Sequence, residues 1–387
     1  MPLNATTNAD YSGLLSTIAC VSVLSRRSVN PLLPPIRQAG GPHSESLIMK
    51  TMLRWEIDAI GRDRLALKEA AIPSPGDHDI LVKVKAVALN YRDKMVIESG
   101  RGLPISFPFT PGSDLAGEVV ALGPNVSRFT PGDRVISTFM PDWIDGLRPG
   151  DARTPAYRTL GGYYPGVLAE YVAMSEDWFV RAPATLNDVE AATLPCAGVT
   201  AWFALMERAG VRSGDTVLIP STGGVALFGL QIAKANGAEV IVSGALENGQ
   251  RARALGADHY IDKTREDWVE AVYAATGDRG ADHILEVIGG SHLARSVQVA
   301  AVGGHICQIG ALDGFDVSAP AMPLMLKDVT IHGIGTGSRR ALTRLVRAVD
   351  RTGIKPVIDT RYPFADLSAA LDHLDRGPFG KVVIELP

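Results

Sequence analysis

A glycine-rich segment, Ser221-Thr222-Gly223-Gly224-Val225, contains residue types that can hold a phosphate group. Glycine has no side chain, so the backbone can approach a phosphate closely. A helix that begins at such a turn points its free N–H groups and the positive end of its dipole at the phosphate. The same residues also suit an ordinary turn, so the elements on either side must decide between the two interpretations.

The flanking residues predict alternating strands and helices. An apolar run at 216–219 precedes the turn, and residues 225–236 after it have helical periodicity. The alternation continues at 239–243, 250–255, 259–261, 268–276, 281–287 and 304–309. It predicts an α/β fold with a doubly wound parallel sheet of the Rossmann type, which binds ligands at the carboxyl ends of its strands. We therefore expect the turn to bind the pyrophosphate of a nicotinamide dinucleotide, although Ser221 replaces the first glycine of the usual pattern.

The position about 20 residues after the turn indicates which dinucleotide is preferred. NAD-binding chains have an acid there for the ribose hydroxyl, whereas this chain reads Ser243-Gly244 and has its first acid at Glu247. Ser243 could donate to a 2′-phosphate, and Arg251 or Arg253 could neutralise it. We expect NADP(H) to be preferred over NAD(H). The alternative is that both arginines only form the solvated face of a short helix.

Residues 50–181 have a different pattern, which predicts a β-rich region. Strands are expected at 80–87, 115–121 and 134–137, separated by Gly/Pro turns, and a long surface loop is expected at 141–165. Near the end of the chain, residues 339–352 predict a helix and residues 381–386 a final strand.

Composition excludes several classes of protein. The 387-residue chain is 46% hydrophobic and has a net charge of −4, which gives no electrostatic footprint for nucleic acid. It has no apolar run long enough to span a membrane. Three cysteines far apart favour a reducing compartment, the cytoplasm. Residues 1–48 are expected to be a disordered extension or, alternatively, an organellar presequence.

Five segments resemble the medium-chain dehydrogenase/reductase superfamily, in particular its zinc-free, quinone-oxidoreductase-like branch. They are residues 111–120 (PGSDLAGEVV), 129–135 (FTPGDRV), 194–202 (LPCAGVTAW), 254–258 (ALGAD) and 379–383 (FGKVV). The resemblance implies a GroES-like catalytic domain at 49–181, a Rossmann NAD(P)-binding domain at 182–315, and a segment at 316–387 that completes the catalytic domain.

The resemblance also implies further cofactor contacts. Thr200 would lie beside the nicotinamide, and the backbone at Ile309 and Gly310 would meet its carboxamide. Ser338, Arg339 and Lys381 are further candidates, with a purely structural role as the alternative for each.

Zinc ligands are missing from the positions at which the resemblance would place them. Zinc-binding relatives have a Cys-His pair where this chain reads Asn90-Tyr91-Arg92-Asp93, and Gly-His-Glu where it reads Gly112-Ser113-Asp114. Cys196 falls at the third ligand position, but one thiolate does not make a zinc site. No metal is therefore expected.

Without a metal, the most accessible chemistry is hydride transfer to a polarised C=C bond or a quinone, because a few donors can stabilise the resulting oxyanion. Candidate catalytic groups are Asn90 as a donor, Tyr91 as a proton donor and Asp93 as an orienting group; alternatively, they only brace a turn and pack a wall. Aromatic residues of the long loop could cover an apolar or aromatic substrate: Trp143, Tyr157, Tyr163 and Tyr164. Other hypotheses are a metal-free alcohol dehydrogenase or carbonyl reductase, and a dinucleotide-binding protein without activity.

Residues 329–333 predict an edge strand. An exposed sheet edge needs covering, and pairing across a two-fold axis would do so. We therefore expect a homodimer.

Overall fold

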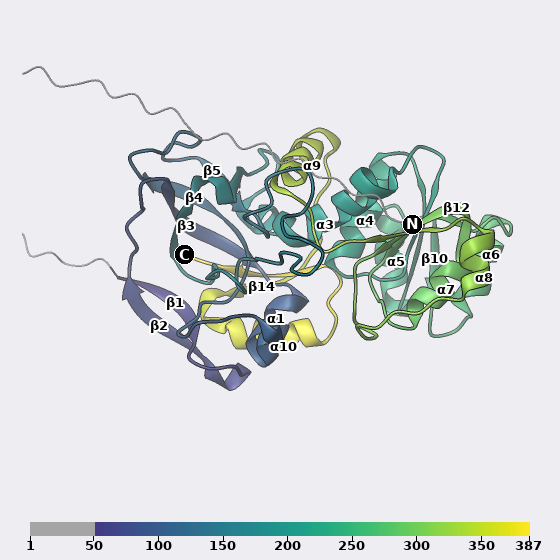
Figure 1. Cartoon of the computed structure of the whole chain (residues 1–387), viewed down its shortest axis with the longest axis horizontal. Coiled ribbons are helices and arrows are strands. Elements are labelled where there is room, and N and C mark those ends of the chain that lie inside the picture. Colours follow the sequence, from purple (N-terminus) through teal and green to yellow (C-terminus); the bar gives the residue numbers. More distant parts are fainter. Residues whose placement is uncertain (1–50) are drawn as a thin grey trace, which may run out of the picture. The chain divides into compact units, whose positions relative to one another are not determined.

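The computed structural model describes residues 51–387, so the expectations for residues 1–48 lie outside the described residues (Figure 1). Within the described part of the chain, no helix combines the length and apolar character needed to cross a membrane.

A six-stranded, all-parallel sheet forms the centre of the cofactor-binding fold, in the order β10-β9-β8-β11-β12-β13 (Figure 1). Its strands are β8 (Thr216–Ile219), β9 (Glu239–Gly244), β10 (His259–Asp262), β11 (Ala281–Glu286), β12 (Ala300–Gln308) and β13 (Thr330–Gly333). All four residues of β8 are buried, as expected for a central parallel strand covered on both faces. The predicted Rossmann sheet is confirmed, with β12 beginning four residues earlier than expected.

Helices follow the strands in the predicted alternation. They are α4 (Gly224–Ala235), α5 (Gly249–Ala254), α6 (Trp268–Thr276) and α7 (His292–Val299). A further helix, α8 (Ala321–Leu326), was not predicted. A helical stretch before β8 was not predicted. It consists of α2 (Asp188–Ala191), the π-helical η4 (Leu194–Gly198), α3 (Val199–Trp202) and the π-helical η5 (Phe203–Ala209).

A second, seven-stranded sheet forms the GroES-like part. Its order is β14-β15-β3-β4-β5-β7, and β6 pairs with β3. Its strands are β3 (Asp79–Ala88), β4 (Asp114–Leu122), β5 (Arg134–Ser137), β6 (Tyr171–Ser175), β7 (Phe179–Arg181), β14 (Ile358–Pro363) and β15 (Lys381–Glu385). A separate hairpin, β1 (Thr51–Ile57) with β2 (Leu65–Ala71), was not specified by the sequence pattern.

The last strand of the chain joins this second sheet. β15 pairs antiparallel with β3, and Val383 lies opposite Ala88. The segment 316–387 is nevertheless divided between the two sheets, because β13 pairs with β12 of the parallel sheet. β13 therefore belongs to the parallel sheet, although it follows residue 315, where the Rossmann domain was expected to end.

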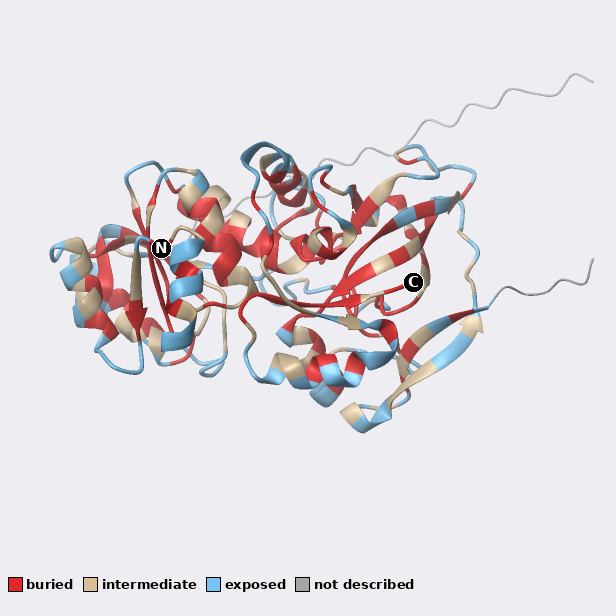
Figure 2. Ribbon diagram, turned by 180° about the vertical axis from the view of Figure 1, so that it is seen from behind, coloured by how far each residue is buried: buried red, intermediate tan, exposed pale blue. Residues whose placement is uncertain are grey.

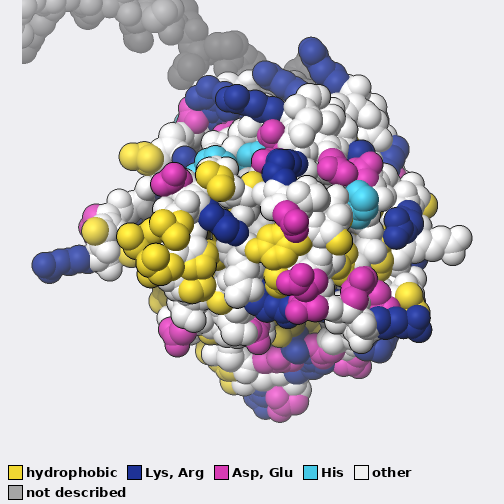
Figure 3. Space-filling view, turned by 90° about the vertical axis from the view of Figure 1, so that its right-hand side faces the viewer, with side chains coloured by type: hydrophobic (Ala, Val, Ile, Leu, Met, Phe, Trp, Pro, Cys, Tyr) yellow, Lys and Arg dark blue, Asp and Glu magenta, His cyan; other side chains and the backbone are white. Residues whose placement is uncertain are grey.

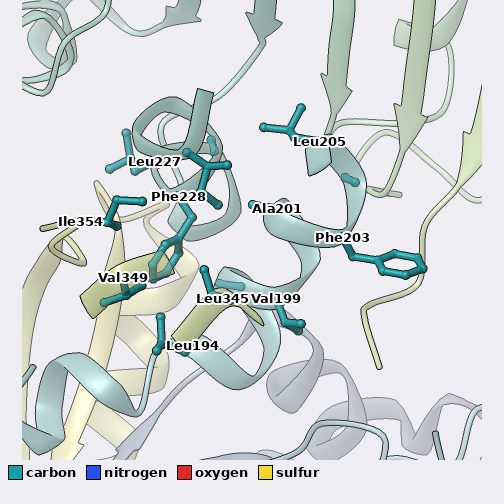
Figure 4. Packing of buried hydrophobic residues seen from close by; sticks show 14 of the residues in the cluster. Leu194, Val199, Ala201, Phe203, Leu205, Leu227, Phe228, Leu345, Val349 and Ile354 are labelled. Carbon is teal, nitrogen blue, oxygen red and sulfur yellow. The ribbon is translucent and has the colours of Figure 1, made fainter. Parts of the chain in front are cut away.

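The largest buried hydrophobic cluster surrounds α3, α4 and α9 (Arg339–Thr352), as Figure 4 shows. Leu342, Leu345 and Val349 of α9 are buried at a spacing of three and four residues, so one face of the helix packs inward. Figure 2 shows buried residues concentrated along the strands of both sheets. This packing holds the helical stretch at 188–209 against the start of α4.

Two further helices lie at the edge of the second sheet. They are α1 (Tyr91–Ser99), which follows β3 directly, and α10 (Leu367–Asp375), which packs on β15. The expected long loop at 141–165 contains no helix or strand, but it is not wholly a surface loop. Trp143 is 1% exposed, and its ring packs edge-on against Phe203 with the centroids 5.2 Å apart.

Candidate functional site

The glycine-rich turn joins β8 to α4, as expected. Gly223 is the N-cap of α4 in an extended conformation, and its N–H donates to Ser221 Oγ at 3.2 Å. Ser221 therefore braces the turn from the position of the missing glycine. A Cβ added at Gly223 would meet only Ser221 Oγ, at 3.7 Å, so the backbone here faces open space. The turn thus has the free helix N-terminus and the open approach that a pyrophosphate needs.

The C-terminal strand docks on the other side of this turn. Gly380 N–H donates to the Thr222 carbonyl at 3.1 Å, and the Thr222 hydroxyl accepts from Asn248 Nδ2 at 3.0 Å. A Cβ added at Gly224 would lie 2.5 Å from Lys381 Cδ, so glycine is needed for this close approach. The aliphatic part of Lys381 therefore packs directly against the first residue of α4.

The ammonium group of Lys381 reaches into a buried polar cluster. Its Nζ donates to the Leu89 carbonyl at 2.5 Å and to Asn90 Oδ1 at 2.6 Å, and the residue is only 5% exposed. Because an ammonium can only donate, Asn90 must present its oxygen to Lys381 and its amino group elsewhere. Asn90 Nδ2 donates to Ser113 Oγ in a long contact of 3.4 Å. One lysine thus joins the phosphate turn to the amide that sequence analysis proposed as a donor.

The cluster continues to the π-helical stretch η4. Ser113 Oγ donates to Asp114 Oδ1 at 2.5 Å, and Asp114 Oδ2 accepts the Cys196 N–H at 3.0 Å. We refer to Asn90, Ser113, Asp114, Cys196 and Lys381 as the polar cluster. Its members come from β4, β15, η4 and the ends of two loops, and together they connect the second sheet to η4.

Burial sets the electrostatics of this cluster. It raises the pKa of the fully buried Asp114 to about 6, a shift that the charge of Lys381 opposes and the charge of Asp93 reinforces. Burial also raises the pKa of the Cys196 thiol, and the negative charge of Asp114 adds to the effect. Cys196 is therefore a neutral thiol at physiological pH, which makes it a poor nucleophile.

The polar cluster does not fit a zinc ion. Zinc needs three or four anionic or imidazole ligands, whereas this position has an amide, a hydroxyl, a single cysteine and one carboxylate. The Lys381 ammonium already provides the positive charge at Asn90. Across residues 51–387, no three His, Cys, Asp or Glu side chains converge in a way that could hold a metal ion.

The three proposed catalytic residues lie at the start of α1, but they differ in environment. Asn90 is the N-cap and is 8% exposed. Asp93 is fully buried: it accepts the Asn90 N–H at 2.8 Å and lies 3.5 Å from Arg92 Nη1. Tyr91 is exposed. Asp93 therefore fixes Asn90 through its backbone, which corresponds to the bracing interpretation, and of the three residues only Tyr91 is exposed.

A cavity of about 190 Å³ lies beside α1, and of the three proposed catalytic residues Tyr91 lines it. It is lined by Tyr91, Arg92, Met95, Val96, Arg101, Leu103, Tyr157, Ala311, Leu312 and Phe315. Most of these side chains are apolar or aromatic, and they come both from α1 and its following turn and from the segment after β12. Of the four loop aromatics, Tyr157 lines the cavity, whereas Trp143 is buried in the core and Tyr164 donates to Asp142.

The residues proposed to select the dinucleotide lie near the end of β9. Ser243 is buried at the end of β9, and no carboxylate lies between Ser243 and Glu247. Arg251 stacks on the Phe379 ring at 3.9 Å and pairs with Asp359 at 3.3 Å, and half of its side chain is exposed. Its guanidinium is thus anchored beside the phosphate turn rather than displayed on a free helix face.

The remaining cofactor candidates already have partners within the chain. The N–H groups of Ile309 and Gly310 both donate to the Glu286 carbonyl, at 2.8 and 3.1 Å. Ser338 caps α9 by accepting the Ala341 N–H, and Arg339 forms an ion pair with Asp177 at 2.6 Å. These contacts support the purely structural role that was the alternative for Ser338 and Arg339.

Thr200 lies in α3 and is buried. α3 packs against α4, so Thr200 belongs to the same helical layer as the phosphate turn. Sequence reasoning placed Arg92 in the candidate donor segment 90–93 but gave it no role; its Nη1 donates to the carbonyls of Leu160 and Gly161 at 3.0 and 3.3 Å. It also missed that Lys381 contacts Asn90, 291 residues away, for which no local pattern gives a signal.

Comparison with known proteins agrees with this architecture. A family model for the alcohol dehydrogenase GroES-like domain matches residues 76–184, and one for zinc-binding dehydrogenases matches residues 224–351. A zinc-type alcohol dehydrogenase-like protein of Schizosaccharomyces pombe is 35% identical, over 84% of this chain and 96% of its own. The human quinone oxidoreductase is 26% identical, over 82% and 92%. A crystal structure of a putative alcohol dehydrogenase from Sinorhizobium meliloti is 60% identical with a TM-score of 0.85, covering 87% of this chain and 99% of that one. The chain belongs to the medium-chain dehydrogenase/reductase superfamily and is an NAD(P)-dependent oxidoreductase.

Proposed function

We propose that this enzyme is an NADPH-dependent, zinc-independent reductase that transfers hydride to an activated C=C bond or a quinone. The observation that carries the proposal is the contact between Lys381 and Asn90, because it puts an ammonium and an oriented amide where a zinc-dependent relative would need metal ligands. One matching family model describes zinc-binding dehydrogenases, but the donors of the polar cluster do not suit that ion.

The chemistry that a bound nicotinamide dinucleotide supplies is hydride transfer, and Ser221 to Val225 would hold its pyrophosphate. Lys381 fixes the oxygen of the Asn90 amide, and the N–H of that amide that does not contact Ser113 is the proposed donor to a substrate carbonyl oxygen. An aimed donor of this kind stabilises the negative charge that develops on that oxygen. The phenols of Tyr91 and Tyr157 both line the cavity and are the candidates to return a proton to the substrate.

The proposal is tested with an isosteric change, Asn90→Asp. The new carboxylate keeps an oxygen for Lys381, but it has no N–H to donate and adds a repelling charge. Loss of one such donor typically costs a factor of about 10²–10³ in kcat. We expect a fall of that size in NADPH-dependent enone and quinone reduction, with the melting temperature retained. Unchanged turnover in a folded Asn90→Asp variant would contradict the role of Asn90.

A second candidate function is supported by relatives named as alcohol dehydrogenases. A metal-free carbonyl reductase would use the same cofactor site and the same amide donor. A panel of enones, quinones, ketones and aldehydes with NADPH separates the two, since the proposed enzyme reduces the first two classes faster. If no substrate is turned over although NADPH binds, the non-catalytic interpretation is favoured.

The preference for NADPH rests on Ser243 and Arg251. Because Ser243 and Gly244 carry no carboxylate, a 2′-phosphate meets no repulsion at that position, and the anchored Arg251 can donate to it. We expect Arg251→Ala to lower kcat/KM for NADPH by about tenfold and to leave NADH unchanged, since a hydrogen bond to a charged group contributes about 1.5–3 kcal/mol. The matched control is Arg351→Ala, which removes an exposed arginine at the end of α9. A wild-type preference for NADH would contradict the assignment.

We also propose that the chain forms a homodimer through β13, the edge strand of the parallel sheet. Exposed apolar residues of α8 lie close to this edge in sequence, including Met322, Met325 and Leu326. Figure 3 shows hydrophobic side chains gathered at the end of the molecule that carries α6, α7 and α8. Light scattering tests the proposal: we expect the mass of two chains, and a monomer would contradict it.

The substrate is proposed to be a small apolar or aromatic molecule, and the protein to act in the cytoplasm.

A further inference from the structure

The turn after α1 places an arginine beside the cavity. Gly100, Arg101 and Gly102 have φ values of 64°, 53° and 65°, so three consecutive residues are left-handed. This conformation costs a non-glycine residue about 1 kcal/mol or more, and asparagine or glycine would adopt it more readily. The turn directs the Arg101 guanidinium toward Met95 Sδ at 3.8 Å, and both residues line the cavity.

The Arg101 guanidinium also meets the opposite wall of the cavity. Its Cζ lies 4.4 Å from the centre of the Phe315 ring, which comes from the segment after β12. A guanidinium stacked on an aromatic face keeps the N–H groups along its edge free for a planar, two-pronged partner. Arg101 has no carboxylate within ion-pair distance anywhere in residues 51–387, whereas Arg92, the other arginine of the cavity, lies beside Asp93. None of the residues that line the cavity is acidic.

We propose that the substrate carries a carboxylate and that Arg101 binds it. This inference rests on the proposed reductase function and specifies its substrate class. The cavity volume of about 190 Å³ is enough for one aromatic ring, because a 150 Å³ apolar cavity is known to hold one benzene ring. The cavity therefore suits a compact aromatic or branched enone with one acidic group, held between Arg101 and the apolar wall formed by Val96, Leu103 and Leu312.

The test compares two substrates that differ only in charge: an aromatic enone with a ring carboxylate, and its methyl ester. For the wild-type enzyme with NADPH, kcat/KM for the acid should exceed that for the ester by about tenfold, which corresponds to a charge-assisted hydrogen bond. The key variant is Arg101→Asn, which suits the left-handed turn and removes the guanidinium together with its contacts with Met95 and Phe315. In this variant, kcat/KM should fall for the acid and stay unchanged for the ester, so that the preference is lost. Arg376→Ala removes an exposed arginine elsewhere and should keep the preference.

Binding measurements separate this inference from the reductase proposal. Calorimetric titration of 4-phenylbutyrate and of the corresponding amide, in the presence of NADP⁺, should show tighter binding of the acid to the wild type and no difference for Arg101→Asn. If neither enone is reduced but the acid binds in this Arg101-dependent way, the reductase proposal fails and the carboxylate site stands. The carboxylate site would be overturned if the wild type had equal kcat/KM for acid and ester and bound 4-phenylbutyrate and its amide equally. It would also be overturned if Arg101→Asn weakened the charged and the neutral compounds to the same extent.

Discussion

Replacing Lys381 with methionine would remove the cation that joins the phosphate turn to the polar cluster. Methionine keeps most of the aliphatic packing against Gly224 but has no donor. The Leu89 carbonyl and Asn90 Oδ1 would both lose a hydrogen bond, and the buried Asp114 would lose a favourable charge. An unsatisfied buried acceptor costs about 1–3 kcal/mol, and breaking a buried charge interaction costs about 3–5 kcal/mol. Because the two effects overlap, we expect the free energy of unfolding to fall by about 3–5 kcal/mol at pH 8.

This loss should depend on pH. The pKa of Asp114 is already raised to about 6, so ionisation of Asp114 destabilises the folded protein as the pH rises from about 4 to 6. Without Lys381 the pKa rises further, and each additional unit costs about 1.4 kcal/mol above that pKa. At pH 5, where Asp114 is largely protonated in both proteins, the difference between wild type and Lys381→Met should therefore be smaller than at pH 8.

Urea unfolding at pH 5 and pH 8 measures both effects. The matched control is Lys68→Met, which removes an exposed lysine from β2 and should change the free energy of unfolding by less than about 0.5 kcal/mol. A loss below about 1 kcal/mol for Lys381→Met would refute the reasoning, since it would mean that the buried ammonium satisfies little. An equal loss at both pH values would refute the proposed coupling to Asp114.

Three further predictions concern other parts of the site. Glu286 is fully buried, and although burial alone would raise its pKa, hydrogen bonds from His292, Ser296 and Gly289 together with the charge of His292 hold that pKa below its usual value. Glu286→Gln should therefore lower the free energy of unfolding by about 2–4 kcal/mol at pH 7. This difference should disappear as the pH falls below about 4, and urea unfolding at several pH values measures it. Gly224→Ala should weaken NADPH binding at least about tenfold in a fluorescence titration while the protein remains folded, because the new Cβ displaces Lys381 beside the turn; equal affinity would contradict the packing. Gly310→Ala should destabilise the chain by about 2 kcal/mol or more in thermal unfolding, because its Cβ would clash with the Val287 carbonyl; a retained melting temperature would contradict this close approach.

The parallel sheet could be predicted because each of its units is local. A short apolar run, a glycine turn and an amphipathic helix all lie within about 30 residues, so β8, the turn and α4 were visible in the sequence. The hairpin β1–β2 and the π-helical stretches η4 and η5 were not predicted, because their stability depends on packing against distant segments. Trp143 illustrates the same limit. The segment at 141–165 is rich in Gly, Pro and aromatic residues and was therefore expected to be a surface loop, yet Trp143 is buried and packs on Phe203.

The candidate site was only partly accessible to sequence reasoning. The residues of the turn, Ser243 and Asn90 could be named from their positions next to predicted strands. The contact of Lys381 with Asn90 could not, since it depends on β15 pairing with β3 across the whole body of the chain. Likewise, Arg101 and Phe315 meet only because two separate segments form the walls of one cavity.

The most direct test of the account is enone reduction by protein that has been dialysed against a chelator and analysed for zinc. The account predicts NADPH-dependent reduction at full rate with far less than one zinc per chain, because Asn90 and Lys381 take the place of metal ligands. Activity that falls with the zinc content and returns when zinc is added would contradict it.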